Sequence, residues 1–363
     1  MKGSGVQTVV LYTEGALELY IDGHHHFGGD LYQLRRVPLV LQLDPGPHQL
    51  DLRLVRDVRA NGGIGSPKID VSIRAGIATP GLSITADSVL MPDCLIERND
   101  FASSYGSVMV RNDHNQDLEI VKLRPTKDNL SISIVNDRVI RIIPGQTRPV
   151  AFEIKSHSDC PESVSFSVQY KSVENNELSE HTQVITTAVR RKSILSPHKI
   201  TYLHPGGIIS KAIIQPPVWK TEMEDDASNA KTSESKAFLA PVLLQLHGSG
   251  VDPENPMVAD SLTSLDLHAW TVFPAGVTPW TGDDWHQWGF YDVKAAVDAL
   301  STWIDRNKWS QGPIPALDSW MVTGHSNGGQ GTWYTMTHQP DYVFAGAPVA
   351  GYSSIQSVFT IIA

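Results

Sequence analysis

The sequence predicts a multidomain chain in which β-sandwich regions precede a partial α/β domain with a mostly parallel sheet and helices on both faces. Three observations predict it. Short strands separated by glycine- and proline-rich turns fill the first 195 residues. A polar run over 219–237, WKTEMEDDASNAKTSESKA, interrupts this pattern and predicts a mobile surface loop. After that loop, apolar strands alternate with a helical pattern, which is typical of an α/β domain.

The composition is that of a globular protein. Of the 363 residues, 41% are hydrophobic and 19% are charged, which is enough apolar material to build cores. The formal net charge of −10 argues against nucleic acid as a partner. No apolar run reaches the ~18 residues of a membrane span, and the N-terminus lacks the pattern of a signal peptide. We therefore expect a soluble protein whose compartment and oligomeric state the sequence leaves open.

The chain contains two cysteines, Cys94 and Cys160. Two cysteines do not make a disulfide framework. They can pair only if the fold brings them together, and the sequence does not favour this. The cysteines therefore leave the redox compartment undecided.

The first region, residues 1–78, is expected to be β-sandwich-like, and it need not be complete. Residues 17–21 alternate between apolar and polar side chains and end at an Asp-Gly turn pair. The run over 37–43 stops at the turn sequence Asp-Pro-Gly-Pro, after which residues 48–55 alternate with a period of two. Strands of this kind bury one face of a sheet.

Residues 79–195 repeat this texture and predict an immunoglobulin-like β-sandwich. About seven short strands in this stretch suit such a fold, and no pattern with the helical period of 3.6 residues appears. The strand candidates include residues 108–110, 118–121, 131–134, 151–154, 165–170 and 182–186.

Residues 196–363, which include the loop over 219–237, predict the α/β domain. Three apolar runs are typical of buried central strands: 242–246, 271–274 and 320–323. Between the second and third runs, apolar residues recur at helical spacing from Asp292 onward, and Asp292 is placed to cap that helix. A further strand is expected around 344–349.

The third run leads directly into Gly324-His325-Ser326-Asn327-Gly328, a G-x-S-x-G motif between a strand and a helix. A serine at such a sharp turn has a strained backbone that lifts its hydroxyl above the sheet. Side chains two residues before and after it would collide with the neighbouring strand and helix, so glycine stands at both places. Asn327 then begins the helix, and its backbone N–H can face a developing oxyanion. The alternative is a tight turn that needs glycines only for packing.

A second motif, His247-Gly248-Ser249-Gly250, follows the strand over 242–246. The end of that strand is where a second oxyanion donor is expected. Because backbone N–H groups would perform that task, we expect the His247 side chain to be structural. His325 fills the variable position of the serine motif, and we expect it to pack rather than to take part in catalysis.

These motifs resemble those of the prolyl oligopeptidase family, and more broadly of α/β-hydrolase peptidases and esterases. The matching residues are HGSG at 247–250, Asp292, GHSNGGQGTW at 324–333 and PDYVFAGAPVAG at 340–351. The resemblance covers about 198–363, less than half of the chain. It implies an α/β-hydrolase catalytic domain with Ser326 as the nucleophile and with oxyanion N–H groups from Asn327 and Ser249. It implies no cofactor and no metal, and it is compatible with secreted full-length relatives.

The sequence departs from this family in one respect. In this fold the triad follows the order Ser, then Asp or Glu, then His, yet only 37 residues, 327–363, follow Ser326. They include His338 and Asp341, in the helix after the nucleophile and at its end, and neither is expected to reach the hydroxyl. A serine without its base is a weak nucleophile. The sequence therefore resembles a C-terminally truncated domain, and we expect little or no hydrolase activity from this polypeptide alone.

Two further groups of side chains are candidates for binding. Trp285 and Trp288 lie, with Trp280, in a loop after the second α/β strand, and they either line a substrate pocket or pack in a core. His24–His26 are adjacent histidines in a turn rich in glycine and aspartate, where solvated side chains are commoner than metal ligands. We therefore expect no metal site there.

With the resemblance, the sequence predicts a serine hydrolase of prolyl oligopeptidase type that cleaves peptide bonds through an acyl-enzyme on Ser326. Two alternatives stay open. One is a carboxylesterase of the same fold, with an ester as its substrate. The other is a non-catalytic binding or scaffold protein that carries β-sandwiches and a degenerate hydrolase domain.

Overall fold

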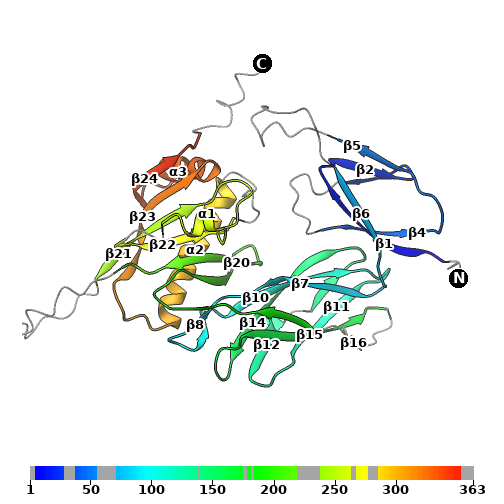
Figure 1. Cartoon of the computed structure of the whole chain (residues 1–363), viewed down its shortest axis with the longest axis horizontal. Helices are drawn as coiled ribbons and strands as arrows, with labels where there is room; N and C mark the ends of the chain where they lie inside the picture. The colour runs from blue at the N-terminus through cyan, green and yellow to red at the C-terminus, as the bar shows by residue number, and fades with distance from the viewer. Residues whose placement is uncertain are drawn as a thin grey trace, which may run out of the picture.

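The computed structural model describes most of the chain, and Figure 1 shows it coloured along the sequence. The described residues are 5–27, 37–54, 71–137, 139–174, 178–180, 184–218, 238–262, 267–276 and 285–352. The expected mobile loop over 219–237 lies outside these ranges, as does Trp280. None of the described helices is long and apolar enough to cross a membrane.

The N-terminal part of the chain forms two three-stranded antiparallel sheets. The first has the order β4-β1-β6, from β4 (Leu39–Leu43), β1 (Gln7–Glu14) and β6 (Ser72–Ile77). The second has the order β3-β2-β5, from β3 (His24–Phe27), β2 (Glu18–Ile21) and β5 (Leu50–Arg53). Asp22 and Gly23 have φ angles of 52° and 79°, so β2 and β3 are joined by the tight turn that an Asp-Gly pair favours. The apolar core of this part contains Leu11, Leu19, Ile21 and Leu41.

Two further sheets share one apolar core, and together they form the paired-sheet region (residues 82–188). The four-stranded sheet has the order β12-β14-β10-β7, from β12 (Leu130–Ile134), β14 (Thr147–Ser156), β10 (Tyr105–Asn112) and β7 (Leu82–Leu90). The five-stranded sheet contains β13 (Ile140–Ile142), β11 (Leu118–Pro125), β15 (Ser163–Ser172), β16 (Leu178–Glu180) and β17 (Ile185–Ala188). One turn of 3₁₀ helix, Val135–Asp137, is the only helical element among the described residues of this region.

Alternation of side chains explains the core of the paired-sheet region. Along β12, Leu130, Ile132 and Ile134 are buried, and the serines between them are exposed. Phe152 of the four-stranded sheet and Phe166 of the five-stranded sheet meet in the core with ring centroids 5.8 Å apart. Inward-facing side chains of two sheets interdigitate in this way when the sheets pack face to face.

A bridging segment, residues 93–104, connects β7 to β10 and contacts two cores. Its strands β8 (Cys94–Leu95) and β9 (Asp100–Phe101) pair with each other, and β8 also pairs in parallel with β18 (Arg191–Lys192). Cys94 and Phe101 are buried in the core of the paired-sheet region. Leu95 and Ala102, their neighbours in the chain, are buried in the core of the region that follows.

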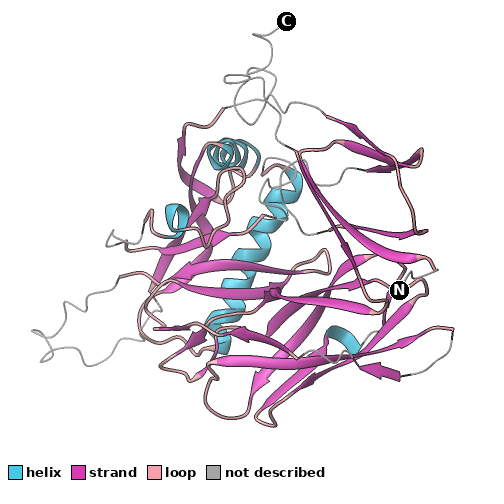
Figure 2. Cartoon of the chain, turned by 45° about the vertical axis from the view of Figure 1, so that its right-hand side comes forward, coloured by secondary structure: helices cyan, strands magenta, loops and turns pink. Residues whose placement is uncertain are grey.

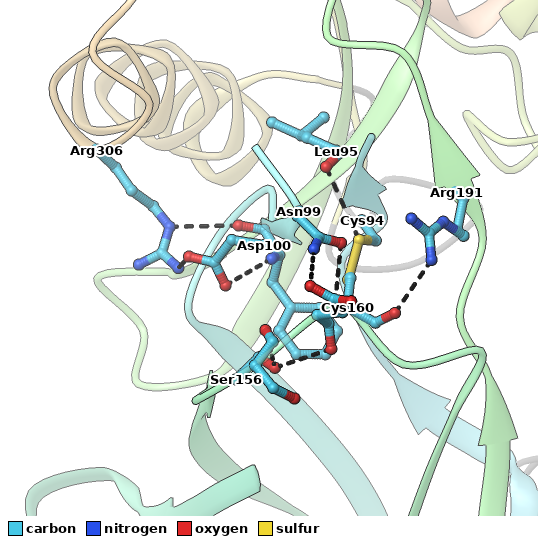
Figure 3. Close-up of a disulfide and its surroundings, with 11 residues drawn as sticks. Cys94, Leu95, Asn99, Asp100, Ser156, Cys160, Arg191 and Arg306 are labelled. Carbon is cyan, nitrogen blue, oxygen red and sulfur yellow. Dashed lines mark hydrogen bonds and ion pairs between the residues drawn. A yellow bond between two sulfur atoms is a disulfide. The ribbon is translucent and has the colours of Figure 1, made fainter. Parts of the chain in front are cut away.

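Cys94 and Cys160 form a disulfide that ties the bridging segment to the loop after β14, as Figure 3 shows. The backbone N–H of Cys160 donates to the side-chain oxygen of Asn99 at 3.2 Å, and the Arg191 guanidinium donates to the Cys160 carbonyl at 3.2 Å. The expectation that the two cysteines stay unpaired is wrong. Their separation of 66 residues hides the contact, because the pairing exists only once β8 lies beside that loop.

The last part of the chain, the mixed-sheet region (residues 198–349), is built on a six-stranded sheet with the order β19-β20-β22-β21-β23-β24. Its strands are β19 (His198–Leu203), β20 (Ile209–Gln215), β21 (Leu239–Leu246), β22 (Trp270–Pro274), β23 (Ile314–His325) and β24 (Val343–Val349). β19 and β20 pair antiparallel, whereas β22, β21, β23 and β24 are parallel to one another. Because parallel neighbours end at the same edge of a sheet, the segments that follow β21 and β23 lie together.

Helices α2 (Gln287–Arg306) and α3 (Asn327–His338) lie against this sheet, and Figure 2 shows the long α2 running along it. The buried stripe of α2 joins the main core, which holds Leu246 of β21 and Val272 of β22. Phe273, the next residue of β22, instead packs with Val258 of the four-residue helix α1 (Pro256–Ala259). Only this short helix lies on the second face among the described residues, so a full layer of helices on both faces stays a prediction.

α2 begins at Gln287, five residues before the start that the sequence predicts. Asp292 therefore lies inside the helix, where it is buried, and its Oδ1 is 3.0 Å from Nε2 of His204. The expected capping role of Asp292 is wrong. The true start carries no capping signal, because His286 at the N-cap position makes no side-chain hydrogen bond to the helix.

Candidate functional site

Ser326 lies at the bend between β23, which ends at His325, and α3, which begins at Asn327. Its φ and ψ of 57° and −115° fall outside the regions that residues other than glycine ordinarily adopt. Its backbone N–H donates to the carbonyl of Val349 at 2.9 Å, and its carbonyl accepts from the N–H of Gln330 at 3.0 Å. These two bonds hold the strained conformation in place, and strain of this kind concentrates at functional sites.

Gly324 and Gly328 permit the bend because backbone atoms approach their α-carbons closely. A Cβ on Gly324 would lie 2.5 Å from the carbonyl oxygen of Gly328. A Cβ on Gly328 would lie 2.0 Å from the carbonyl oxygen of Leu246 in β21. Backbone atoms of a central strand cannot move aside as a side chain can, so any residue larger than glycine would displace α3 from the sheet. This is the steric reason for both glycines that the sequence predicts.

The turn over 247–250 lies beside Ser326. The last residue of β21, Leu246, pairs in register with Gly324 of β23, so the two strands end side by side. A Cβ on Gly248 would lie 3.3 Å from the carbonyl oxygen of His325 and 3.8 Å from the Cβ of Ser326. The fold thus brings the two predicted motifs into contact.

The two backbone amides predicted as oxyanion donors, those of Asn327 and Ser249, belong to these two turns. Asn327 is buried and is the first residue of α3, so its N–H lies at the helix N-terminus, where the helix dipole favours negative charge. Ser249 is partly buried in the turn after β21, and Gly250 beyond it has a φ of 73° that glycine adopts readily. Both residues lie with Ser326 at the carboxyl edge of the parallel strands.

His247 is held on both sides at the start of its turn. Its ring is buried, Nδ1 lies 3.0 Å from the carbonyl of Gly248, and Nε2 accepts from the N–H of Gly276 at 3.2 Å. Burial lowers the pKa of His247, so the ring is neutral and Nδ1 carries the proton. A fixed neutral imidazole suits the structural role that the sequence predicts for this residue.

Trp285 packs between the 247–250 turn and α3. Its side chain is 1% exposed, its indole N–H donates to the carbonyl of His247 at 3.0 Å, and the two rings meet edge to face at 4.8 Å. A Cβ on Gly331 of α3 would lie 2.5 Å from the Cβ of Trp285. Its φ of 64° is unusual for a bulky residue. Of the two alternatives that the sequence leaves open, core packing describes Trp285, and a pocket lining does not.

Trp288 and His325 are exposed. Trp288 lies in the first turn of α2 with 66% of its surface exposed, so of the two alternatives that the sequence leaves open, a substrate contact stays a prediction for it. The expectation that His325 packs is wrong, because its side chain is exposed. His325 pairs with Val349 of β24, a strand whose described residues are themselves mostly exposed.

A general base for Ser326 is absent from the described part of the chain. No histidine or carboxylate among the described residues hydrogen-bonds the Ser326 hydroxyl. His338 lies at the far end of α3, where its Nδ1 is 3.1 Å from the carbonyl of Tyr334. This placement agrees with the expectation that His338 does not serve Ser326.

The structure gives no support for a metal site at the three adjacent histidines. His24–His26 lie on the exposed strand β3, and the ring of His25 is 5.0 Å from that of Tyr20. The described residues contain no group of three histidine, cysteine, aspartate or glutamate side chains arranged to hold a metal ion. The absence of a metal site stays a prediction for the whole chain.

Comparison with known proteins gives one curated relative. No family model matches the chain. A protein of Arthroderma benhamiae described as an uncharacterized secreted protein is 37% identical over 353 residues, and the match covers 96% of this chain and 36% of that protein. The chain therefore spans about a third of the length of this relative.

Several solved structures match parts of the chain weakly. The fluorophosphonate-binding serine hydrolase F of Staphylococcus aureus matches at 16% identity, with 44% of this chain and 58% of that chain covered and a TM-score of 0.30. An S-formylglutathione hydrolase of the same organism matches at 16% identity, with 46% and 61% covered and a TM-score of 0.30. A thermostable esterase matches at 14% identity, with 74% and 78% covered and a TM-score of 0.24. TM-scores this low carry no argument about fold or activity.

Proposed function

We propose that the mixed-sheet region carries the nucleophile of a serine hydrolase, with Ser326 attacking a carboxylic carbonyl. The strained bend at Ser326, seated between two obligatory glycines and against the 247–250 turn, is the observation that carries the proposal. A serine on a strand–turn–helix bend is the arrangement of an α/β-hydrolase nucleophile. The strand order supports the same assignment, because β21 is the third strand of this sheet in chain order and precedes the proposed second donor.

The proposed reaction is acyl transfer through a covalent intermediate. The Ser326 oxygen bonds to the carbonyl carbon while a base accepts the hydroxyl proton. The carbonyl oxygen becomes an oxyanion, which the backbone N–H groups of Asn327 and Ser249 stabilise. Collapse of this intermediate breaks the bond to the amine or alcohol, which leaves with the proton. Water then releases the acyl group from Ser326 by the same steps in reverse order.

We place the base and its partner acid outside the described residues. Neither His338 nor any other described histidine hydrogen-bonds the Ser326 hydroxyl, and the chain spans 36% of the length of its curated relative. The described residues would then supply the nucleophile and the oxyanion donors. On their own they should support little turnover.

We propose peptides as the substrates of the complete enzyme, because the motifs at 247–250 and 324–333 resemble those of the prolyl oligopeptidase family. An ester of the same acyl group would react through the same steps. The substrate class therefore follows from rates of the complete enzyme on a peptide and an ester that share one acyl group, and turnover of the ester without cleavage of the peptide would reject the peptidase.

The division into domains is part of the proposal. We assign residues 1–78 to a β-sandwich-like region, 79–195 to an immunoglobulin-like sandwich and 196–363 to the α/β-hydrolase domain. Strand pairing among the described residues supports these limits, because no sheet contains strands from both sides of residue 79 or of residue 195.

We also infer that the protein is secreted. The curated relative is described as secreted, and disulfides such as Cys94–Cys160 persist in oxidising compartments and are rare in the cytosol. Detection of the protein in the culture medium of its native host, rather than in the cell lysate, tests this inference.

A fluorophosphonate probe tests the proposed nucleophile, because it phosphonylates only an activated serine. Imidazole in the buffer acts as an external general base, in place of the base that the described residues lack. We expect the folded chain to be labelled at Ser326 at least about tenfold faster than the urea-unfolded chain, because folded oxyanion donors accelerate attack without a complete triad. The variant Ser326→Ala should show no labelling. Equal labelling of folded and unfolded chains would favour the non-catalytic binding protein instead.

A further inference from the structure

Glu254 lies at the centre of a cluster of ion pairs in the mixed-sheet region. Its Oε2 accepts from Nζ of Lys211 at 2.6 Å. Its Oε1 lies 2.7 Å from the guanidinium of Arg190 and 3.1 Å from Nζ of Lys199. The Glu254 side chain is 22% exposed and those of the two lysines 15–17%, so water screens the two lysine pairs much less than pairs on an open surface.

The loop that carries Glu254 continues directly from the proposed oxyanion turn. Val251 donates its N–H to the carbonyl of Gly248 at 3.3 Å, and Asn255 donates to the carbonyl of Asp252 at 2.9 Å. The carboxylate of Asp252 also accepts from the N–H of Glu254 at 2.9 Å. The backbone from Gly248 to Asn255 is therefore a series of short turns with no strand to hold it, and side-chain anchors must fix its position.

The anchors of this loop come from two parts of the fold. Lys199 and Lys211 stand on β19 and β20 of the mixed sheet. Arg190 precedes β18, and its guanidinium also binds the carboxylate of Asp93 at 2.8 and 3.2 Å. Asp93 is buried, begins the bridging segment and is adjacent to the disulfide-bonded Cys94. The loop is thus joined to the rigid sheet on one side and to the bridging segment on the other.

The cluster is electrically balanced. It contains three cations (Arg190, Lys199, Lys211) and three carboxylates (Asp93, Asp252, Glu254). Burial alone would raise the pKa of Glu254, but the charges of Lys199, Lys211 and Arg190 outweigh it and hold that pKa at about 2. Glu254 is therefore ionised at neutral pH, and removing its charge would take from Lys199 its carboxylate partner and would weaken the hold of Lys211 and Arg190 on the loop.

We propose that Glu254 is a positioning residue for the oxyanion turn. By anchoring the loop after Gly250 to Lys211 and Arg190, it keeps the N–H of Ser249 fixed where an oxyanion forms beside Ser326. The inference rests on the proposed function and deepens it. Fixed donors stabilise charge more effectively than mobile ones, because they require no reorganisation when the charge develops.

The test is amide hydrogen exchange of the full chain, read on the peptide that covers 247–255. The variant Glu254→Gln keeps the shape of the side chain and removes its charge. We expect exchange in this peptide to rise about tenfold, with no rise in the peptide that covers β21. The matched control is Glu119→Gln, which removes a carboxylate of equal exposure (22%) from an ion pair with Lys171 in the paired-sheet region. Glu119→Gln should leave exchange over 247–255 unchanged.

Two lysine variants separate charge from bulk. Lys211→Arg keeps the charge and should retain slow exchange over 247–255, whereas Lys211→Met should behave as Glu254→Gln does. Fast exchange in Lys211→Arg, or unchanged exchange in Glu254→Gln, would overturn the proposal. An equal rise over the whole mixed sheet would also overturn it, because it would indicate general destabilisation.

The rate at which a fluorophosphonate labels Ser326, with imidazole present, tests whether the position of the loop affects the reactivity of Ser326. Glu254→Gln should lower the maximal labelling rate about tenfold and leave the probe concentration at half-maximal rate unchanged, since the oxyanion forms only in the transition state. A normal maximal rate in Glu254→Gln would reject the positioning role and leave the proposed function intact. If the unaltered chain is not labelled, the proposed function fails, and the exchange experiment alone then decides whether Glu254 fixes the loop.

Discussion

The paired-sheet region and the mixed-sheet region are both built mainly from strands, yet different contacts hold them together. In the paired-sheet region, apolar side chains of two sheets fill a common core, and a disulfide fixes the bridging segment to it. In the mixed-sheet region, backbone atoms approach Gly324 and Gly328 closely, and a partly buried ion cluster around Glu254 joins β19 and β20 to the loop after Gly250. The first region can absorb local changes by moving side chains. The second contains positions where one added methyl group has no space.

The sequence provides a direct way to observe the two regions separately. All nine tryptophans of the chain follow residue 218, and none lies in the paired-sheet region. Tryptophan fluorescence therefore reports on the mixed-sheet region, and far-ultraviolet circular dichroism reports on the strands of the whole chain. The two signals can be compared during unfolding in urea.

The largest effect is expected from Gly328→Ala. The new Cβ would lie 2.0 Å from the carbonyl oxygen of Leu246, so α3 must move away from β21. We expect a loss of about 4 kcal/mol in the free energy of unfolding, mainly in the tryptophan signal. The comparison variant is Gly106→Ala in the paired-sheet region, whose Cβ would meet the Phe152 ring at 2.4 Å. Because a ring can shift, Gly106→Ala should cost less, and an equal cost would contradict the contrast between the regions.

Removal of the disulfide should have the next largest effect. The variant with Cys94→Ser and Cys160→Ser removes a cross-link with a sequence separation of 66 residues, and the loss of a disulfide typically costs about 2–4 kcal/mol. We expect the circular dichroism transition to shift more than the tryptophan transition. Reduction of the unaltered protein should reproduce the shift. An equal shift of both signals would mean that the cross-link stabilises the two regions as one unit.

Acid should weaken the mixed-sheet region through His198, which is fully buried beside Trp303 at a ring distance of 5.3 Å. Burial lowers the pKa of His198 to about 4, although Nδ1 bonds the carbonyl of Ser196. The unfolded imidazole titrates near 6.5, so the stabilisation is complete above pH 6.5 and is lost as the pH falls to 4. The expected loss is roughly 3 kcal/mol.

The variant His198→Asn tests this assignment, because it keeps a donor near Ser196 and cannot titrate. The tryptophan-monitored free energy of unfolding should then lose most of its change between pH 6.5 and 4. His325→Asn, at an exposed position, is the control and should retain the pH dependence of the unaltered chain. A pH profile that His198→Asn leaves unchanged would assign the acid sensitivity to other groups.

The smallest expected effect belongs to Trp285→Phe. It keeps an aromatic ring but leaves the carbonyl of His247 without its donor at 3.0 Å, which should cost about 1–2 kcal/mol. Trp288→Phe, on the exposed first turn of α2, should change the free energy of unfolding by less than about 0.5 kcal/mol. Similar losses in the two variants would show that the contact with His247 does not matter.

Local rules made part of this structure predictable from sequence. The apolar runs over 242–246 and 320–323 lie within β21 and β23, because a buried strand needs continuous apolar residues. The bend at Ser326 was predictable because its steric demands fall on glycines only two residues away. These features depend on neighbours in the chain.

The features that the sequence did not reveal depend on distant segments. The partner of Cys94 depends on the position of β8, and the partner of Asp292 is His204, which precedes the loop over 219–237 in the chain. Nothing in the local sequence distinguishes Glu254 from other acidic residues. Its role depends on the cations that β19, β20 and the segment before β18 place beside it. The start of α2 was misplaced because its N-cap, His286, gives no capping signal.

The bridging segment has a consequence for how the polypeptide can be divided. Leu95 and Ala102 complete the core of the mixed-sheet region although they precede its first strand by about a hundred residues in the chain. A fragment that begins at residue 196 would carry a hole in its interior where these two side chains belong, and Arg306 would lose the carboxylate of Asp100. During synthesis the bridging segment emerges from the ribosome before β19–β24 do. These six strands can therefore pack against Leu95 and Ala102 as they fold.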